Sequence, residues 1–112
     1  MENITENNRL IADFMGLDVF YDTKVHHETA EKNKVTEMKY HSDWNWLMPV
    51  VEKIESLVFT NDIYYNFNIL GGCQVYVISS DMEELIDVSA KTKLLSVYEA
   101  VIEFIKWYNL NK

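Results

Sequence analysis

The chain has 112 residues, of which 48% are apolar, 25% are charged and one is proline. This length supports one hydrophobic core, so we expect a single domain over residues 1–112, and the apolar content excludes a disordered tail. The net charge is −8, with Arg9 as the only arginine, which argues against direct binding of a nucleic-acid backbone, because such binding needs clustered cations.

The compartment follows from three features of the sequence. No apolar run approaches the ~20 residues of a membrane span, and residues 1–9 do not form a basic stretch that leads into an apolar one. Cys73 is the only cysteine, so an intrachain disulfide cannot form. We therefore expect a cytoplasmic protein without a membrane segment.

The first predicted element is a helix over residues 5–15. Its apolar positions share one face, Thr5 or Asn7 is placed to cap its start, and Gly16 is placed to end it in a left-handed conformation. Residues 18–21 are strand formers, and we expect a short strand there.

Residues 22–40 are polar and show almost no apolar periodicity. Two structures fit this composition, an exposed hairpin that turns near residues 31–34 or a long loop, and we favour the hairpin. Long irregular segments in compact domains often carry function. We therefore treat this insertion as a candidate functional segment.

A second helix is expected over residues 43–57, with Ser42 or Asp43 at its start. Apolar residues three and four positions apart form one stripe along it. Pro49 falls inside this stretch, so we expect either a kink or a separate first turn.

The strongest strand signal covers residues 63–79, where two alternating runs flank Gly71 and Gly72. Alternation around two glycines predicts an antiparallel hairpin with a tight turn. Ile86 and Val88 suggest one more short strand. A last helix is expected over residues 92–108, with Leu95 and Ile102 among the residues that widen its apolar stripe.

These elements predict an α+β fold in which a small antiparallel sheet of about three to five strands packs with two or three helices. The sequence holds more large aromatic rings than so small a core can cover. Trp44, Tyr64 and Trp107 lie off the main apolar stripes, so they are candidates for an exposed protein-binding patch. The alternative is that these rings snorkel or pack as part of a second helix layer.

Catalytic and metal-binding patterns are weak. His26 and His27 are adjacent, so on a strand they point to opposite faces, and His41 is distant in sequence. Cys73 lies in an alternating apolar run, where a cysteine usually packs as a small hydrophobic side chain. We therefore expect neither an enzyme nor a metal site, and no cofactor.

Two segments resemble a known group of proteins. Residues 44–54, W-N-W-L-M-P-V-V-E-K-I, and residues 93–109, K-L-L-S-V-Y-E-A-V-I-E-F-I-K-W-Y-N, look like the hallmark stretches of small uncharacterised proteins of flavobacteria, their relatives and their phages. That group is similar to the phage ABA sandwich domain, in which helices cover a small antiparallel sheet. The resemblance implies a phage or prophage context in the cytoplasm of a bacterial host, and it transfers no catalytic residue.

The leading functional hypothesis is a non-enzymatic phage-type protein, a monomer or homodimer, that binds and inhibits a host protein. The most plausible target is a nucleic-acid-handling defence effector such as an RNA-guided nuclease, which would make the chain anti-CRISPR-like. The alternatives are a protein that sequesters a small nucleotide signal, a structural phage protein, and a hydrolase that uses Cys73 or a histidine. The expected protein-binding residues lie on the insertion and its flanking aromatics: His26, His27, Glu28, Glu31, Tyr40 and Trp44.

Overall fold

The computed structural model of the chain describes residues 4–16, 38–59 and 62–111. The part it describes contains three α-helices and one three-stranded antiparallel sheet, which confirms the predicted α+β class. In chain order the elements are α1 (Ile4–Met15), α3 (Trp44–Ser56), β1 (Tyr65–Ile69), β2 (Gln74–Ser79), β3 (Glu84–Ser89) and α4 (Lys93–Asn111). The strand expected at residues 18–21 and most of the insertion at 22–40 lie outside the described residues.

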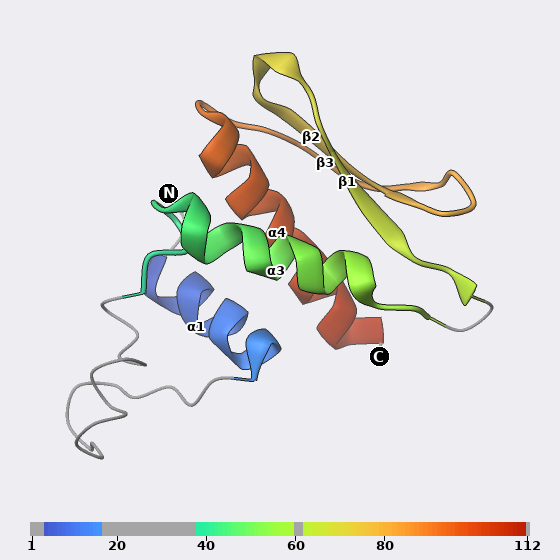
Figure 1. Cartoon of the computed structure of the whole chain (residues 1–112), viewed down its shortest axis with the longest axis horizontal. Helices are drawn as coiled ribbons and strands as arrows, with labels where there is room; N and C mark the ends of the chain where they lie inside the picture. Colours follow the sequence, from blue (N-terminus) through green and yellow to red (C-terminus); the bar gives the residue numbers. More distant parts are fainter. Residues whose placement is uncertain (1–3, 17–37, 60–61, 112) are drawn as a thin grey trace.

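The elements form three layers (Figure 1). The sheet has the order β1-β2-β3. α3 contacts β1, and α4 contacts β2 and β3, so these two helices form the middle layer. α1 packs on α3 and α4 on the side away from the sheet. Within the described residues no helix has both the length and the apolar content to cross a membrane.

The start of α3 agrees with the sequence. The Asp43 carboxylate accepts a hydrogen bond from the Asn45 N–H at 2.8 Å and caps the helix. The helix then continues through Pro49, so the alternative of a separate first turn is wrong. Proline at this position removes only one backbone hydrogen bond, and the buried side chains of Val50 and Ile54 hold the helix on both the sheet and α4.

The β1–β2 hairpin has the expected strands but a wider turn than predicted. Pairing extends from Tyr65 opposite Ser79 to Ile69 opposite Val75. The chain then reverses through a 3-10 turn at Gly71–Cys73, where Gly72 and Cys73 have φ of 76° and 67°. Cys73 is thus a half-buried turn residue rather than part of a strand, which corrects the expectation from its alternating surroundings.

The two faces of the sheet differ in polarity. Val75 and Val77 are fully buried on the face that α4 covers, and Ile86 and Val88 of β3 pair with them. The outer face carries the next residues along each strand, including Asn68, Tyr76 and Asp87, which lie side by side. The strand at Ile86 and Val88 that the sequence suggested is therefore confirmed as β3.

A buried hydrogen-bond network fixes the residues before α3 against α1 and α4. Asn8 is 1% exposed, and its amide nitrogen donates to the Met38 carbonyl at 3.2 Å and to Nδ1 of His41 at 3.1 Å. The Tyr98 hydroxyl donates to the Asn8 amide oxygen at 3.0 Å. One side chain of α1 thereby joins the end of the insertion to α4.

The Asn8 network should contribute measurably to stability. Tyr98→Phe leaves the buried Asn8 oxygen without its donor, which we expect to lower the free energy of unfolding by about 1–3 kcal/mol. Urea denaturation measures this loss. Tyr64→Phe is the matched control, because Tyr64 is 44% exposed and its change should stay within about 0.5 kcal/mol. Equal effects of the two variants would contradict a structural role for the network.

Two tyrosines should make the fold sensitive to alkaline pH. Burial raises the pKa of Tyr40. Burial, and then the negative charges of Asp81 and Glu83, raise the pKa of Tyr65. A phenol with a raised pKa in the folded state stabilises the fold fully below its unfolded pKa of about 10, and this contribution is lost as the pH rises through the folded pKa.

We therefore expect the free energy of unfolding to fall between about pH 8 and about pH 11 in the parent protein, and to fall less in Tyr40→Phe and Tyr65→Phe. Urea denaturation at both pH values provides the comparison. An equally steep fall in parent and variants would show that these phenols are as easily ionised in the folded protein as in the unfolded chain.

Candidate functional site

Only two of the six residues that were expected to bind a partner, Tyr40 and Trp44, lie in the described part of the chain. His26, His27, Glu28 and Glu31 lie outside the described residues. Tyr40 is only 3% exposed and packs edge-on against Trp46, with ring centroids 5.1 Å apart. In the described structure Tyr40 is therefore a core residue, and the Asn8 side chain holds its neighbours Met38 and His41 by hydrogen bonds.

The other aromatic candidates divide into two groups. Trp44 and Tyr64 are 39% and 44% exposed, in agreement with the expected surface positions. Trp107 instead packs with Phe59, Tyr65 and Phe104 at centroid distances of 5.4–5.8 Å. For Trp107 the core-packing alternative therefore holds, and the exposed rings do not form the patch of three that the sequence suggested.

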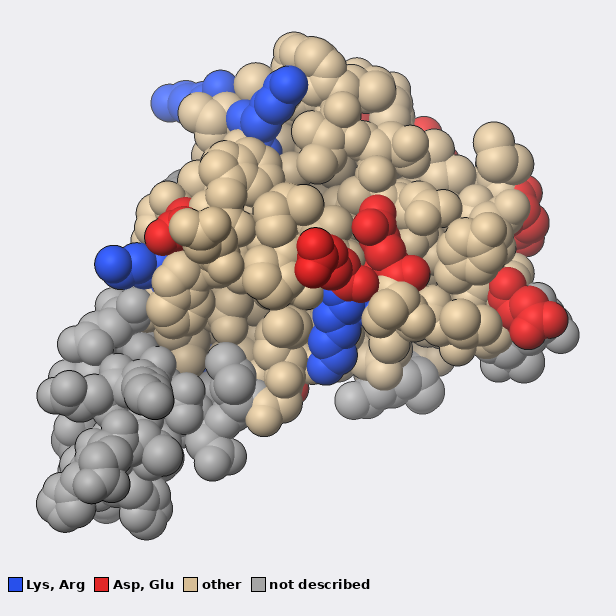
Figure 2. All heavy atoms as spheres, viewed as in Figure 1, with Lys and Arg blue, Asp and Glu red and all other residues tan. Residues whose placement is uncertain are grey.

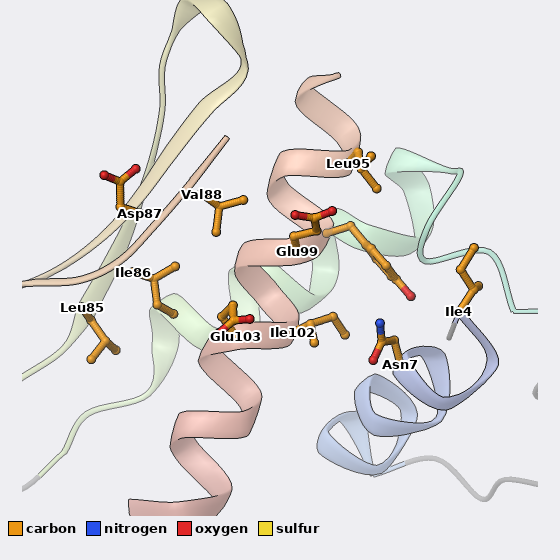
Figure 3. A pocket seen from close by; sticks show the side chains of 11 residues that line it. Ile4, Asn7, Leu85, Ile86, Asp87, Val88, Leu95, Glu99, Ile102 and Glu103 are labelled. Atoms are coloured by element: carbon orange, nitrogen blue, oxygen red, sulfur yellow. The ribbon is translucent and has the colours of Figure 1, made fainter. Parts of the chain in front are cut away.

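A groove of about 630 Å³ lies along one flank of α4. Strand β3 forms one wall, and the first turn of α1 forms the other. Figure 3 shows these three elements around the groove. We call it the α4 groove, and its lining consists of Ile4, Asn7, Leu85, Ile86, Asp87, Val88, Leu95, Tyr98, Glu99, Ile102 and Glu103.

Helical spacing produces the floor of the α4 groove. Leu95, Glu99 and Ile102 are four and three residues apart, so they lie on the same flank of α4, and Glu103 lies next to them. This flank faces the space between β3 and α1 (Figure 3). The floor therefore presents alternating apolar and acidic side chains to whatever occupies the groove.

The walls add apolar surface on both sides. Ile86 and Val88 point from β3 toward α4, whereas the Asp87 carboxylate lies on the other side of the strand (Figure 3). Ile4 closes the far end from α1, with the buried Asn7 beside it. The groove thus combines apolar side chains from β3, α4 and α1 with carboxylates from β3 and α4.

All the charged side chains that line the α4 groove are acidic. Its lining includes Asp87, Glu99 and Glu103, and none of the described residues that line it is lysine or arginine. On the face shown in Figure 2, by contrast, lysine and arginine side chains occur together with acidic ones. The groove therefore favours a guest that combines cationic and apolar groups and disfavours phosphates.

The geometry of this site does not suggest a metal centre. Among the described residues there is no group of three or more histidine, cysteine, aspartate and glutamate side chains placed to hold an ion. The carboxylates of the α4 groove instead come from β3 and from successive turns of α4. This arrangement can attract and orient a bound cationic group by long-range charge.

The α4 groove could not be identified from the sequence. In the sequence pattern Leu95 and Ile102 only widen an apolar stripe. One feature of the sequence could have indicated the groove, namely the acidic pair Glu99 and Glu103 next to these apolar positions. On a helix that is mostly buried, acidic residues mark the part of its surface that no other element covers. The contribution of β3 depends on tertiary structure, which local periodicity cannot supply.

Comparison of the chain with protein-family models, with curated proteins and with solved structures yields no match.

Proposed function

We propose that the protein acts by binding a partner protein, and that the α4 groove is the binding site. The observation that carries this proposal is the combination of apolar side chains and carboxylates in one groove, without a lysine or arginine among the described residues that line it. Apolar side chains of a partner would gain by leaving water in the groove. Its lysine or arginine side chains would pair with Glu99 and Glu103 in the groove and with Asp87 on the outer face of β3. The preferred guest is therefore an exposed segment that is both apolar and basic.

A nucleotide signal, the main alternative from the sequence, fits the α4 groove less well. A nucleotide carries phosphates, which require cations or backbone N–H groups that converge on them. The described residues that line the groove include three carboxylates and no lysine or arginine. The charge of the groove therefore favours binding of a basic protein segment over binding of a nucleotide.

The finer proposal is that the partner is a host defence effector that handles nucleic acid, as expected for an anti-CRISPR-like phage protein. Such effectors hold nucleic acid in positively charged channels. A net charge of −8 would steer the protein toward such a channel, and the α4 groove would then engage a basic segment at its rim. The phage resemblance of residues 44–54 and 93–109 gives this proposal its biological context.

Charge reversal in the α4 groove tests the binding proposal. A displayed library of random peptides, selected on the purified protein, should yield sequences rich in lysine or arginine and in apolar residues. The variant Glu99→Lys/Glu103→Lys should weaken binding of a selected peptide by about 1–2 kcal/mol at low salt, because two solvent-accessible charge pairs become repulsive. Glu52→Lys is the matched control, since Glu52 is exposed on α3 and does not line the groove.

The milder Glu99→Gln/Glu103→Gln variant guards against loss of folding, and far-ultraviolet circular dichroism checks all variants. Two results would count against the proposal. One is a selection that enriches no basic apolar sequences, and the other is equal loss of affinity in the groove variants and in Glu52→Lys.

The finer proposal has its own test. Phage that are blocked by an RNA-guided nuclease should form plaques again when the host expresses the parent protein, and the Glu99→Lys/Glu103→Lys variant should restore far fewer. Plaque counts across a panel of nucleases and other defence systems provide the measurement. Lack of protection against every system would reject the defence-effector target while leaving the binding proposal to the peptide experiment.

A further inference from the structure

We propose that the outer edge of β3 accepts a strand from the partner, and that this strand alternates apolar and basic residues. This inference rests on the proposed function, and it specifies how the partner is held. The added strand would extend the sheet from three strands to four. Its apolar side chains would enter the α4 groove, and its basic side chains would lie over the opposite face of the sheet.

The backbone of β3 supplies the first reason. β3 lies at the end of the sheet order β1-β2-β3 and pairs with β2 from Gln74 opposite Ser89 to Ile78 opposite Glu84. Within the described part of the chain no strand pairs with its other edge. An edge strand offers a row of backbone N–H and C=O groups to an extended peptide.

The side chains of β3 supply the second reason. Ile86 and Val88 face α4, whereas Asp87 and Glu84 are exposed on the outer face of the sheet. Successive side chains of an added strand would alternate between these two faces. The groove face offers apolar surface from Leu95 and Ile102, with Glu99 and Glu103 beside them. The outer face offers the carboxylates of Glu84 and Asp87. The site therefore selects an apolar–basic alternation.

The position of the α4 groove agrees with a strand in this place. An added strand would lie about 4.8 Å beyond β3, on the side where the groove opens between β3 and α1. Every second side chain would then point toward the flank of α4 that carries Leu95, Glu99 and Ile102. Glu99 and Glu103 would remain at the margin, within reach of lysines near the ends of the strand.

Charge argues against a second copy of this chain as the occupant. Pairing of two β3 edges would place Glu84 and Asp87 of both copies on one small surface, with Glu99 and Glu103 of both copies close by. Like charges opposite one another destabilise a strand pair. Acidic residues along the edge thus oppose self-association and favour a basic partner, in agreement with the way edge strands are commonly protected.

The test uses a synthetic peptide of alternating valine and lysine, with a peptide of the same composition in separate valine and lysine blocks as its control. We expect the alternating peptide to bind the parent protein and the block peptide to bind at least about tenfold more weakly, because only alternation matches both faces.

A second experiment introduces N-methylation at one backbone nitrogen of the alternating peptide at a time. Each methyl group on a nitrogen that faces β3 removes one hydrogen bond and should lower the affinity about tenfold, whereas methyl groups on the intervening nitrogens should have little effect.

The outcomes separate the binding mode from the function. A period of two in the effect of N-methylation supports strand addition. Uniform tolerance of N-methylation, or an effect that repeats every three to four residues, would overturn strand addition. The proposed function would still be supported if peptide binding is weakened by the Glu99→Lys/Glu103→Lys variant. Equal binding of the alternating and block peptides would also overturn strand addition. Loss of specific binding by both peptides and by every library-selected peptide would overturn the proposed function itself.

Discussion

The structure depends on α4 being packed on several sides at once. Its residues from Ser96 to Ile105 are buried except for Glu99 and Glu103, and the helix contacts β2, β3, α3 and α1. A helix that is apolar over most of its circumference must be covered over most of it. The sheet, α3 and α1 are therefore arranged around α4, and the Asn8 network fixes α1 and the residues before α3 to it.

The same constraint explains where the candidate site lies. The flank with Leu95, Glu99, Ile102 and Glu103 faces the space between β3 and α1 that the other helices do not fill. Because this space adjoins the edge of β3, apolar surface, carboxylates and an unpaired strand edge occur together within the described residues. Each feature alone is common in small domains, whereas their coincidence carries the proposed binding role.

Local patterns predicted most elements of the fold. Helical periodicity, the Asp43 cap and strand alternation each depend on neighbouring residues, so they could be recognised in the sequence. The turn at Cys73 was misjudged because strand alternation continues across it, although pairing stops at Ile69 and Val75. The burial of Tyr40 was not predicted, because it lies at the end of a polar segment and packs into a core formed by residues remote in sequence. The α4 groove was missed for the same reason, since its floor and walls meet only in the folded chain.

The most direct test of the account is a map of the contact surface by amide chemical shifts, recorded while a library-selected basic peptide is added to the isotope-labelled protein. We predict the largest changes in β3 (Glu84–Ser89) and on the α4 flank from Leu95 to Glu103, because these residues border the α4 groove. Changes confined to residues 22–37, to Trp44 or to the neighbourhood of Tyr64, with β3 and α4 unaffected, would contradict the assignment of the groove as the binding site.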